Sequence, residues 1–234
     1  MATLNVFCAG AAQAVMMEIA AKFERETGNA IAANFGAVGA MKARVVAGEP
    51  ADVIVLTAAL IDELVGQNLA VSGSRVDLGK VGTGVAVRAG TPLPDVTNIQ
   101  VLRGNLLAAK RVLFPDPKVA TAGKVVMAAL EKMGIADELK SRLHFFPNGY
   151  AAMNDLAQSR GLYEMGITQI TEIVANPGVT LVGALPAEVQ NIAVYSAGLA
   201  SHAADTELAR DFIKRLTGFS AKPVLSSAGF DVSS

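Results

Sequence analysis

Short runs of apolar, often β-branched residues alternate with amphipathic helical segments along the whole chain. Within residues 12–26, for example, Val15, Ile19 and Phe23 recur at helical spacing, and Gly28 follows as a C-cap signal. Such alternation is typical of mostly parallel sheets whose strands are joined by crossover helices. The pattern therefore predicts an α/β protein.

The expected elements form two series without a Ser/Gly/Pro-rich linker between them. The first has strands at 4–7, 31–35, 52–56 and 81–88, and helices at 12–26, 40–47 and 58–67. The second has strands at 111–114, 144–146, 166–168 and 179–182, and helices at 98–108, 123–133, 137–142, 151–159 and 171–174. An apolar stretch at 191–199, a helix at 206–216 and a short final helix follow. We expect two α/β lobes with a ligand cleft between them, at the carboxyl ends of the strands.

Composition excludes several classes of function. Of the 234 residues, 52% are hydrophobic and 18% are charged, so a sizeable core is available. Twenty Lys and Arg against 21 Asp and Glu give no basic excess for nucleic-acid binding. One cysteine and two histidines favour neither a disulfide nor a metal site, and no apolar run is long enough to span a bilayer. We expect no metal, no cofactor and no membrane insertion.

Four strand-to-helix junctions contain small or polar residues, at 8–13, 36–41, 115–123 and 147–150. Small residues there let the free N–H groups of a helix N-terminus approach a ligand, and the helix dipole favours an anion. For a single junction, close strand–helix packing is an equally simple explanation. Four junctions together predict an anion site. None of them is a dinucleotide or phosphate-loop motif, and no Gly-x-Ser-x-Gly elbow occurs.

The order of these motifs resembles the molybdate-type periplasmic solute-binding proteins, a branch of the class II venus-flytrap proteins. The matching segments are 4–12 (LNVFCAGAA), 23–28 (FERETG), 35–40 (FGAVGA), 50–53 (PADV), 116–117 (DP) and 226–230 (SSAGF). The resemblance implies a type II periplasmic-binding-protein-like fold, each lobe a mixed, mostly parallel sheet flanked by helices. Both chain ends, 1–84 and 192–234, would form lobe 1, and 85–191 would form lobe 2. Closure would be a hinge motion about the ligand.

Three positions depart from that family. The family usually has a serine where Ala11 and Val38 stand, and a tyrosine where Gln169 stands. Each lost hydroxyl removes a hydrogen bond to an oxyanion, worth about 1.5–3 kcal/mol for a charged partner. These departures favour an organic acid, with carbon to bury, over molybdate.

The candidate ligand-binding residues lie in or near the four junctions and at the end of the strand at 166–168. They are Gly10, Ala11, Ala12, Gln13, Ala37, Val38, Gly39, Lys42, Thr57, Thr121, Ala122, Asn148, Gly149, Tyr150, Thr168 and Gln169, with Asn34, Arg44 and Thr171 as further polar candidates. Lys42 is either a carboxylate ligand or an exposed helix lysine. Arg88 is either a bidentate carboxylate clamp or a surface cap. Cys8 is either an activated thiol or a small core residue.

Two functions remain open at this stage. The first is a small-anion binding protein, whose partner would be an ABC permease if the protein is secreted. The second is a cofactor-free isomerase of an unsaturated di- or tricarboxylate, since some members of this superfamily, related to aconitate isomerase, catalyse a 1,3-proton shift. Candidate bases are Lys42, Asp116, Cys8 and Glu172. Residues 1–3 lead directly into the strand expected at 4–7, without the pattern of a signal peptide, which favours a cytoplasmic protein, or a periplasmic one whose signal has been removed.

Overall fold

The computed structural model describes residues 1–233, and the chain divides into two compact units. Unit 1 contains Met1–Val81 and the residues from Ala193 onward, whereas unit 2 is Gly82–Ile192. Both chain ends therefore belong to unit 1. The boundaries expected from the sequence, at 84/85 and 191/192, lie three residues or fewer from these.

The strands of unit 1 form a mixed sheet. Its three parallel strands are β1 (Thr3–Ala9), β2 (Ala30–Gly36) and β3 (Val53–Thr57), with β1 in the middle. Strand β9 (Ile192–Leu199) runs antiparallel to β3, and the first half of β4 (Val76–Arg88) follows it. Because β1, β2 and β3 are parallel, their carboxyl ends meet at one edge of this sheet.

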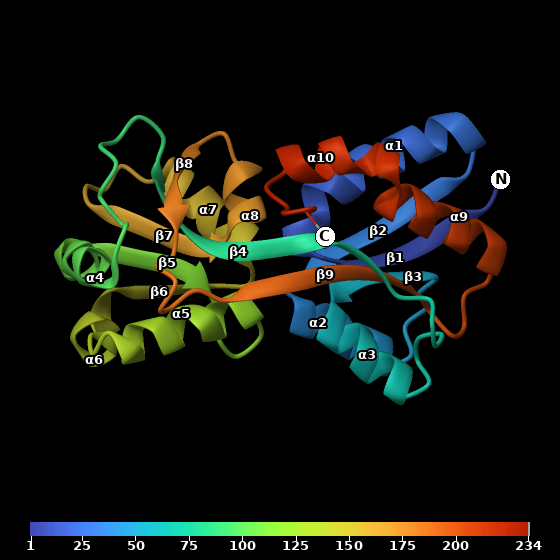
Figure 1. The fold of residues 1–234 in the computed structure, drawn as a ribbon, viewed down its shortest axis with the longest axis horizontal. Coiled ribbons are helices and arrows are strands. Elements are labelled where there is room, and N and C mark those ends of the chain that lie inside the picture. Colours follow the sequence, from blue (N-terminus) through green and yellow to red (C-terminus); the bar gives the residue numbers. More distant parts are fainter. Residues whose placement is uncertain (234) are drawn as a thin grey trace. The chain divides into compact units, whose positions relative to one another are not determined.

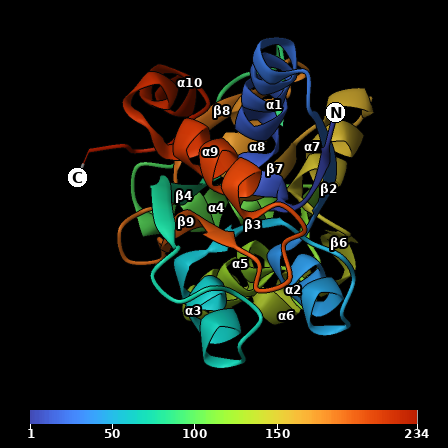
Figure 2. The same cartoon turned by 90° about the vertical axis from the view of Figure 1, so that its right-hand side faces the viewer.

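Helices cover both faces of the unit 1 sheet. They are a 3₁₀ turn (Gly10–Ala12), α1 (Gln13–Thr27), α2 (Val38–Val46), α3 (Ala58–Gly66), α9 (Thr206–Thr217), a second 3₁₀ turn (Phe219–Ala221) and α10 (Lys222–Ser227). Within this unit, α1, α9 and α10 lie on one side of the strands and α2 and α3 on the other (Figure 1). Figure 2 shows α9 beside α1, where the rings of Phe23 and Phe212 meet edge to face at 5.0 Å between centroids.

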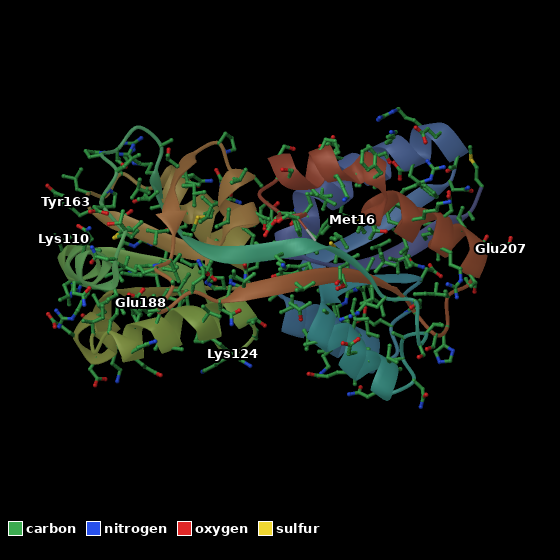
Figure 3. All side chains as sticks on the ribbon, in the orientation of Figure 1. Met16, Lys110, Lys124, Tyr163, Glu188 and Glu207 are labelled. Atoms are coloured by element: carbon green, nitrogen blue, oxygen red, sulfur yellow. The ribbon has the colours of Figure 1, made fainter. Side chains whose placement is uncertain are left out.

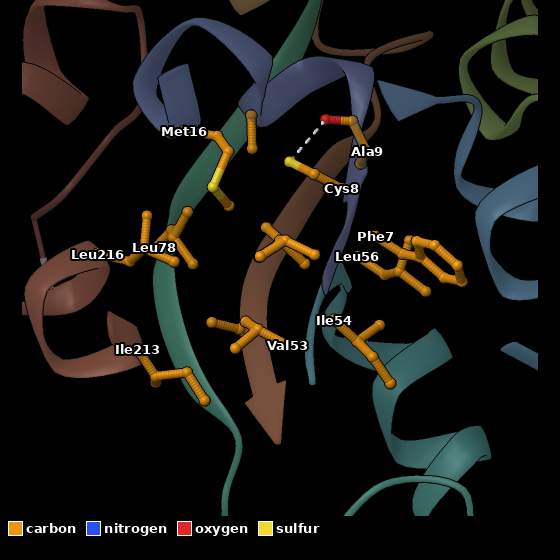
Figure 4. Close-up of a cluster of buried hydrophobic side chains, with 14 of the residues drawn as sticks. Phe7, Cys8, Ala9, Met16, Val53, Ile54, Leu56, Leu78, Ile213 and Leu216 are labelled. Atoms are coloured by element: carbon orange, nitrogen blue, oxygen red, sulfur yellow. Dashed lines mark hydrogen bonds between the residues drawn. The ribbon is translucent and has the colours of Figure 1, made fainter. Parts of the chain in front are cut away.

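The core of unit 1 draws on residues from both chain ends. Val53 and Ile54 alternate between the two faces of β3, and Leu78 comes from β4 (Figure 4). Ile213 and Leu216 of α9 lie against the same cluster. All five side chains are buried, so the segment after Ala193 completes a core that the N-terminal segment begins.

Unit 2 is built around a second mixed sheet. Its parallel strands are β5 (Arg111–Pro115), β6 (Leu143–Phe146) and β7 (Glu164–Gln169), with β5 in the middle. The second half of β4 runs antiparallel to β7 and also pairs with β8 (Val179–Ala184). The fold class expected from the sequence is therefore confirmed.

The helices of unit 2 are α4 (Ile99–Ala108), α5 (Thr121–Lys132), α6 (Ala136–Leu139) with a 3₁₀ turn (Lys140–Arg142), α7 (Gly149–Gln158) and α8 (Ile170–Val174). Neighbouring residues of β4 belong to different cores, because strand side chains alternate between faces. Val85 packs with Phe114 and Leu130, whereas Ala86 packs with Met153 of α7. In Figure 1, α7 and α8 lie on one side of these strands and α5 and α6 on the other.

Some element bounds differ from the sequence-based prediction. Helices α2, α5 and α7 each begin two residues earlier than expected, at Val38, Thr121 and Gly149. The pattern had left Gly39 and Gly149 in loops, although they lie in the first turns of α2 and α7. For α5 it began the helix at Gly123 and missed Thr121 and Ala122. Strand β4 begins at Val76 rather than at 81. The prediction missed its first five residues because apolar and polar side chains are mixed there. Among residues 1–233, no helix is both long and apolar enough to cross a membrane.

Candidate anion-binding site

Three helices of unit 1 begin at the edge where β1, β2 and β3 end. The N-cap positions of α1, α2 and α3 are Ala12, Ala37 and Thr57, and none of these side chains caps its helix with a hydrogen bond. The first N–H groups of a helix have no intrahelical partner, although at α1 the Gln13 N–H already donates to the Gly10 carbonyl of the preceding 3₁₀ turn. This edge of unit 1 therefore offers backbone donors on three adjacent strand-to-helix junctions, with the positive end of each helix dipole.

Side chains at these junctions add little polarity. Ala11, Ala12 and Val38 are buried, with 1–6% of their surface exposed. Gln13 and Thr57 are half-buried and are the polar side chains among the predicted residues there. Gly39, by contrast, is exposed. A ligand at this edge meets backbone amides and methyl groups rather than the hydroxyls of the molybdate-type pattern.

The cations near this edge are already engaged. Lys42 forms an ion pair with Glu63 of α3. Arg44 binds Glu49 at 2.6 Å, donates to the Asn34 side chain at 3.2 Å, and lies over the Phe7 ring. In the structure as it stands, neither cation is free to clamp a carboxylate.

Cys8 lies deep in unit 1. Its thiol is fully buried and donates to the Ala9 carbonyl at 3.3 Å (Figure 4). Burial raises the pKa of the Cys8 thiol far above its ordinary value, so the thiolate does not form near neutral pH. The geometry thus favours a core role over an activated thiol.

In unit 2, the junctions carry polar side chains. Helix α5 begins at Thr121, which is half-buried, and its N-cap Ala120 supplies no side-chain bond. Asp116 is half-buried and accepts a hydrogen bond from the Lys118 N–H at 2.9 Å. Asn148 caps α7 by accepting from the Ala151 N–H at 2.9 Å. These groups follow β5 and β6, which are neighbouring parallel strands.

A buried carboxyl lies at the start of α7. Glu172 of α8 is 5% exposed, and it accepts a hydrogen bond of 2.5 Å from the Thr168 hydroxyl. Burial raises the pKa of Glu172 to about 7, while hydrogen bonds from Thr168 and from the backbone N–H groups of Gly149 and Gln169 act in the opposite direction. No charged neighbour contributes to this shift.

Gly149 makes room for that carboxyl. A Cβ placed on Gly149 would lie 1.9 Å from Glu172 Oε2 and 2.3 Å from Thr168 Oγ1, distances that real atoms do not adopt. The glycine is therefore required by the close approach of Glu172 to the N-terminus of α7. Like Asn148, Glu172 uses an N–H group at the N-terminus of α7 that an external anion would otherwise bind.

Three further buried side chains of unit 2 have polar atoms without a partner. They are the Thr83 and Thr171 hydroxyls and the Gln169 side-chain carbonyl, and all three residues are at most 3% exposed. Thr83 of β4 is paired with Gln169 of β7, so both side chains emerge on the same face of the sheet. Buried polar atoms are nearly always satisfied, so three unpartnered atoms in one part of unit 2 are unusual.

The predicted site residues thus fall into two sets, one in each unit. Unit 1 holds Gly10–Gln13, Ala37–Gly39, Lys42 and Thr57, and unit 2 holds Asp116, Thr121, Ala122, Asn148–Tyr150, Thr168 and Gln169. Sequence reasoning had not singled out Thr83, which lies in the strand expected to carry the chain between lobes. Among the described residues, no three His, Cys, Asp or Glu side chains gather as a metal site.

The chain has two α/β units, and one of them is assembled from both chain ends. In each unit, helices begin at the carboxyl ends of parallel strands. These features define a two-lobed binding protein of the type II class. The family model of the bacterial extracellular solute-binding proteins matches residues 4–231, and the chain belongs to that family.

Its relatives include binding proteins and an enzyme. The chain is 28% identical to an aconitate isomerase from a Pseudomonas species, covering 97% of this chain and 87% of that one. It is 24% identical to the Escherichia coli molybdate-binding protein ModA, over 98% and 89% of the two chains. Among solved structures, the periplasmic molybdate-binding protein of Azotobacter vinelandii superposes with a TM-score of 0.83 at 22% identity, covering 99% and 100%.

Proposed function

We propose that this solute-binding protein takes a small organic di- or tricarboxylate, held at helix N-termini, rather than a tetrahedral oxyanion. The observation that carries the proposal is the chemistry of the unit 1 junctions, where three helices without side-chain caps present backbone donors beside buried Ala11 and Val38. Backbone amides suit carboxylate oxygens, and the methyl groups suit the carbon atoms between them.

The unpaired polar atoms of unit 2 support the same proposal. The Thr83 and Thr171 hydroxyls are neutral donors, so a ligand with several oxygens is recognised without a formal positive charge, whereas the Gln169 carbonyl oxygen only accepts. Lys42 and Arg44 already have acidic partners, so their charges are locally balanced. The relatives include proteins named for molybdate and one named for aconitate isomerisation. Between these two ligand classes, the side chains at the unit 1 junctions favour a carboxylate.

A thermal-shift panel with molybdate, tungstate, sulfate, citrate, cis-aconitate and trans-aconitate tests the ligand class. A ligand at 100 times its Kd adds about 2.7 kcal/mol of stability, or roughly 5–10 °C for a chain of this size. We expect that shift with the tricarboxylates and none with molybdate or tungstate. A shift with molybdate alone would contradict the proposal.

A pair of variants makes the test sharper. Ala11→Ser with Val38→Ser introduces two hydroxyls at the unit 1 junctions, and we expect it to create molybdate binding and to weaken tricarboxylate binding. Ala40→Ser is the matched control, because Ala40 lies in the same helix as Val38 but is exposed. The control should behave like the natural sequence.

Isomerisation is a second candidate function, and the raised pKa of Glu172 favours it. A 1,3-proton shift needs a base that takes a proton from the carbon beside a carboxylate, and donors for the enolate that forms. The double bond then moves and the proton returns at the other end of the three-carbon unit. A carboxyl with a pKa of about 7 is matched to that task near neutral pH, whereas an exposed one is a weaker base.

Proton NMR of cis-aconitate in D₂O separates the binder from the enzyme. If the chain is an isomerase, trans-aconitate forms with deuterium exchange, and Glu172→Gln lowers turnover by about 100-fold or more while the ligand-induced thermal shift remains. Asp116→Asn is the comparison, because Asp116 is the other carboxyl predicted as a base in unit 2. If the natural sequence does not convert cis-aconitate, binding remains as the proposed function. If Glu172→Gln turns over cis-aconitate as fast as the natural sequence, Glu172 is not the catalytic base.

A further inference from the structure

A separate pocket of about 460 Å³ lies within unit 2, at the opposite end of β7 from the candidate anion site. The pocket is lined by Glu164, the first residue of β7, whereas Gln169 is the last. Five residue-to-residue steps of extended strand separate these positions by roughly 16 Å. The pocket is therefore distinct from the junctions discussed above.

The pocket walls are mostly apolar. They come from the end of β4, the loop after it, the end of α4 and the loop before β7, with Val87, Leu93, Ala108, Leu162 and Met165 among them. Leu93 and Leu162 are exposed by 58% and 68% and add apolar surface to the pocket walls. A pocket of this volume fits within the range of small-molecule sites.

The rim of the pocket is held in an uncommon backbone conformation. Tyr163 has a φ of 57°, in the left-handed region that aromatic residues rarely adopt. The Lys110 N–H donates to its carbonyl at 2.7 Å, and Figure 3 shows the two residues together at this end of unit 2. The ring of Tyr163 is thereby kept exposed at the pocket edge.

Two groups of opposite charge face this apolar pocket without a full set of partners. Arg88 Nε is buried and makes no hydrogen bond, and its guanidinium forms no ion pair with any described residue. The Glu164 side chain is 7% exposed; its Oε1 accepts from Arg111 at 3.3 Å, but its Oε2 is buried with no partner. The antiparallel register that pairs Ala86 with Gly166, extended by two residues, places Arg88 opposite Glu164. They nevertheless do not pair with each other.

From this arrangement we infer that the pocket binds a zwitterionic amino acid with an apolar side chain. Its carboxylate pairs with the Arg88 guanidinium, its ammonium donates to Glu164 Oε2, and its side chain lies against Leu93 and Leu162. An apolar carboxylate alone leaves Glu164 unsatisfied, and an apolar amine alone leaves Arg88 unsatisfied. The zwitterion satisfies both groups.

NMR titration of ¹⁵N-labelled protein with L-phenylalanine tests the inference, with 3-phenylpropionate and phenethylamine as probes that each lack one charged group. We expect L-phenylalanine to shift the amide signals of the pocket residues and to bind at least about 10-fold more tightly than either probe. Absence of these shifts, or equal binding of 3-phenylpropionate, overturns the inference.

Variants assign the two charges. Arg88→Met and Glu164→Gln should each lower L-phenylalanine affinity about 10-fold or more, and Glu164→Gln keeps an oxygen for Arg111. Arg160→Met is the matched control, because Arg160 is exposed near the pocket but does not line it. The tricarboxylate thermal shift should be unchanged in all three variants, and its loss on Arg88→Met would place Arg88 in the anion site instead. Unchanged L-phenylalanine binding by Arg88→Met and Glu164→Gln also overturns the inference.

Discussion

Unit 1 and unit 2 present the same local architecture with different chemistry. In unit 1, the helices that follow β1, β2 and β3 begin without side-chain caps, among buried alanine and valine residues. In unit 2, the corresponding junctions carry Thr121, Asn148 and Gln169, and a buried carboxyl lies against the start of α7. Unit 1 thus offers shape and backbone donors, and unit 2 offers side-chain chemistry. Side-chain substitutions should therefore affect unit 2 more strongly than unit 1.

The largest effect is expected at Gly149. Gly149→Ala puts a methyl group into the space of the Glu172 carboxyl and the Thr168 hydroxyl, and should lower the free energy of unfolding by roughly 3 kcal/mol. Gly104→Ala is the control within the same unit, because it lies in α4 with nothing within 4 Å of the added Cβ, and should raise stability by about 0.5–1 kcal/mol. Urea unfolding measures both. Equal effects would contradict the close contact of Glu172 with α7.

The next effect is a dependence of stability on pH. The pKa of Glu172 is raised to about 7 in the fold from 4.5, so the folded state holds this proton more tightly than the unfolded state. The stabilising contribution is complete below pH 4.5 and is lost as the pH rises to about 7, by at most about 3 kcal/mol. Glu172→Gln removes this titration, so its stability relative to the natural sequence should rise between pH 5 and pH 8. Urea unfolding at intervals of one pH unit measures the difference, and parallel curves would count against the raised pKa.

Each unit has an arginine that bridges two carboxylates, which permits a direct comparison. Arg111 of unit 2 binds Asp155 and the largely buried Glu164, whereas Arg215 of unit 1 binds Asp211 and Glu26, whose side chains are 47% and 44% exposed. Arg111→Met should cost about 2–3 kcal/mol, because it leaves a buried carboxylate unpaired. Arg215→Met should cost about 1 kcal/mol or less, since exposed ion pairs contribute little. Thermal unfolding compares them, and a larger loss at Arg215 would reverse the comparison.

The smallest effect is expected at the helix starts of unit 1. Thr57→Ala should change the stability of the ligand-free protein by less than about 0.5 kcal/mol, because Thr57 makes no capping bond to α3. Asp205→Ala should cost about 1 kcal/mol, because the Asp205 carboxylate accepts from the Leu208 N–H at 2.9 Å and caps α9. Denaturant midpoints suffice for this test. If Thr57→Ala lowered stability as much as Asp205→Ala does, the Thr57 side chain would have to cap α3 after all.

Local sequence signals predicted the order of the elements, because apolar periodicity and glycine stops act over a few residues. Val15, Ile19 and Phe23 predicted α1, and Gly28 is its left-handed C-cap, with a φ of 72°. The same signals identified the junctions, since small residues at strand ends are visible in the sequence. The early starts of α2 and α7 were missed because glycine in a first helical turn reads as loop, whereas at α5 the missed residues are Thr121 and Ala122.

Features that depend on distant residues were harder to predict. Glu172 was one of four candidate bases, with nothing local to set it apart, and its burial follows from the packing of α8 against α7 and from the missing side chain of Gly149. The pairing of Thr83 with Gln169 depends on a strand register that no local pattern specifies. The chemistry of unit 1 was therefore easier to anticipate than that of unit 2.

The discontinuous make-up of unit 1 has a consequence for synthesis on the ribosome. Phe7 and Leu56 emerge early, but their core is completed by Phe212, Leu216 and Phe230. The whole of unit 2, 111 residues long, must be translated in between, which takes roughly 6–22 s at bacterial elongation rates. Throughout that interval the nascent N-terminal segment has apolar surface that its own chain does not yet cover. Unit 2 is continuous in sequence, so all its core residues are synthesised before the last core residues of unit 1. We therefore expect chaperones to bind the growing chain mainly at its N-terminal segment.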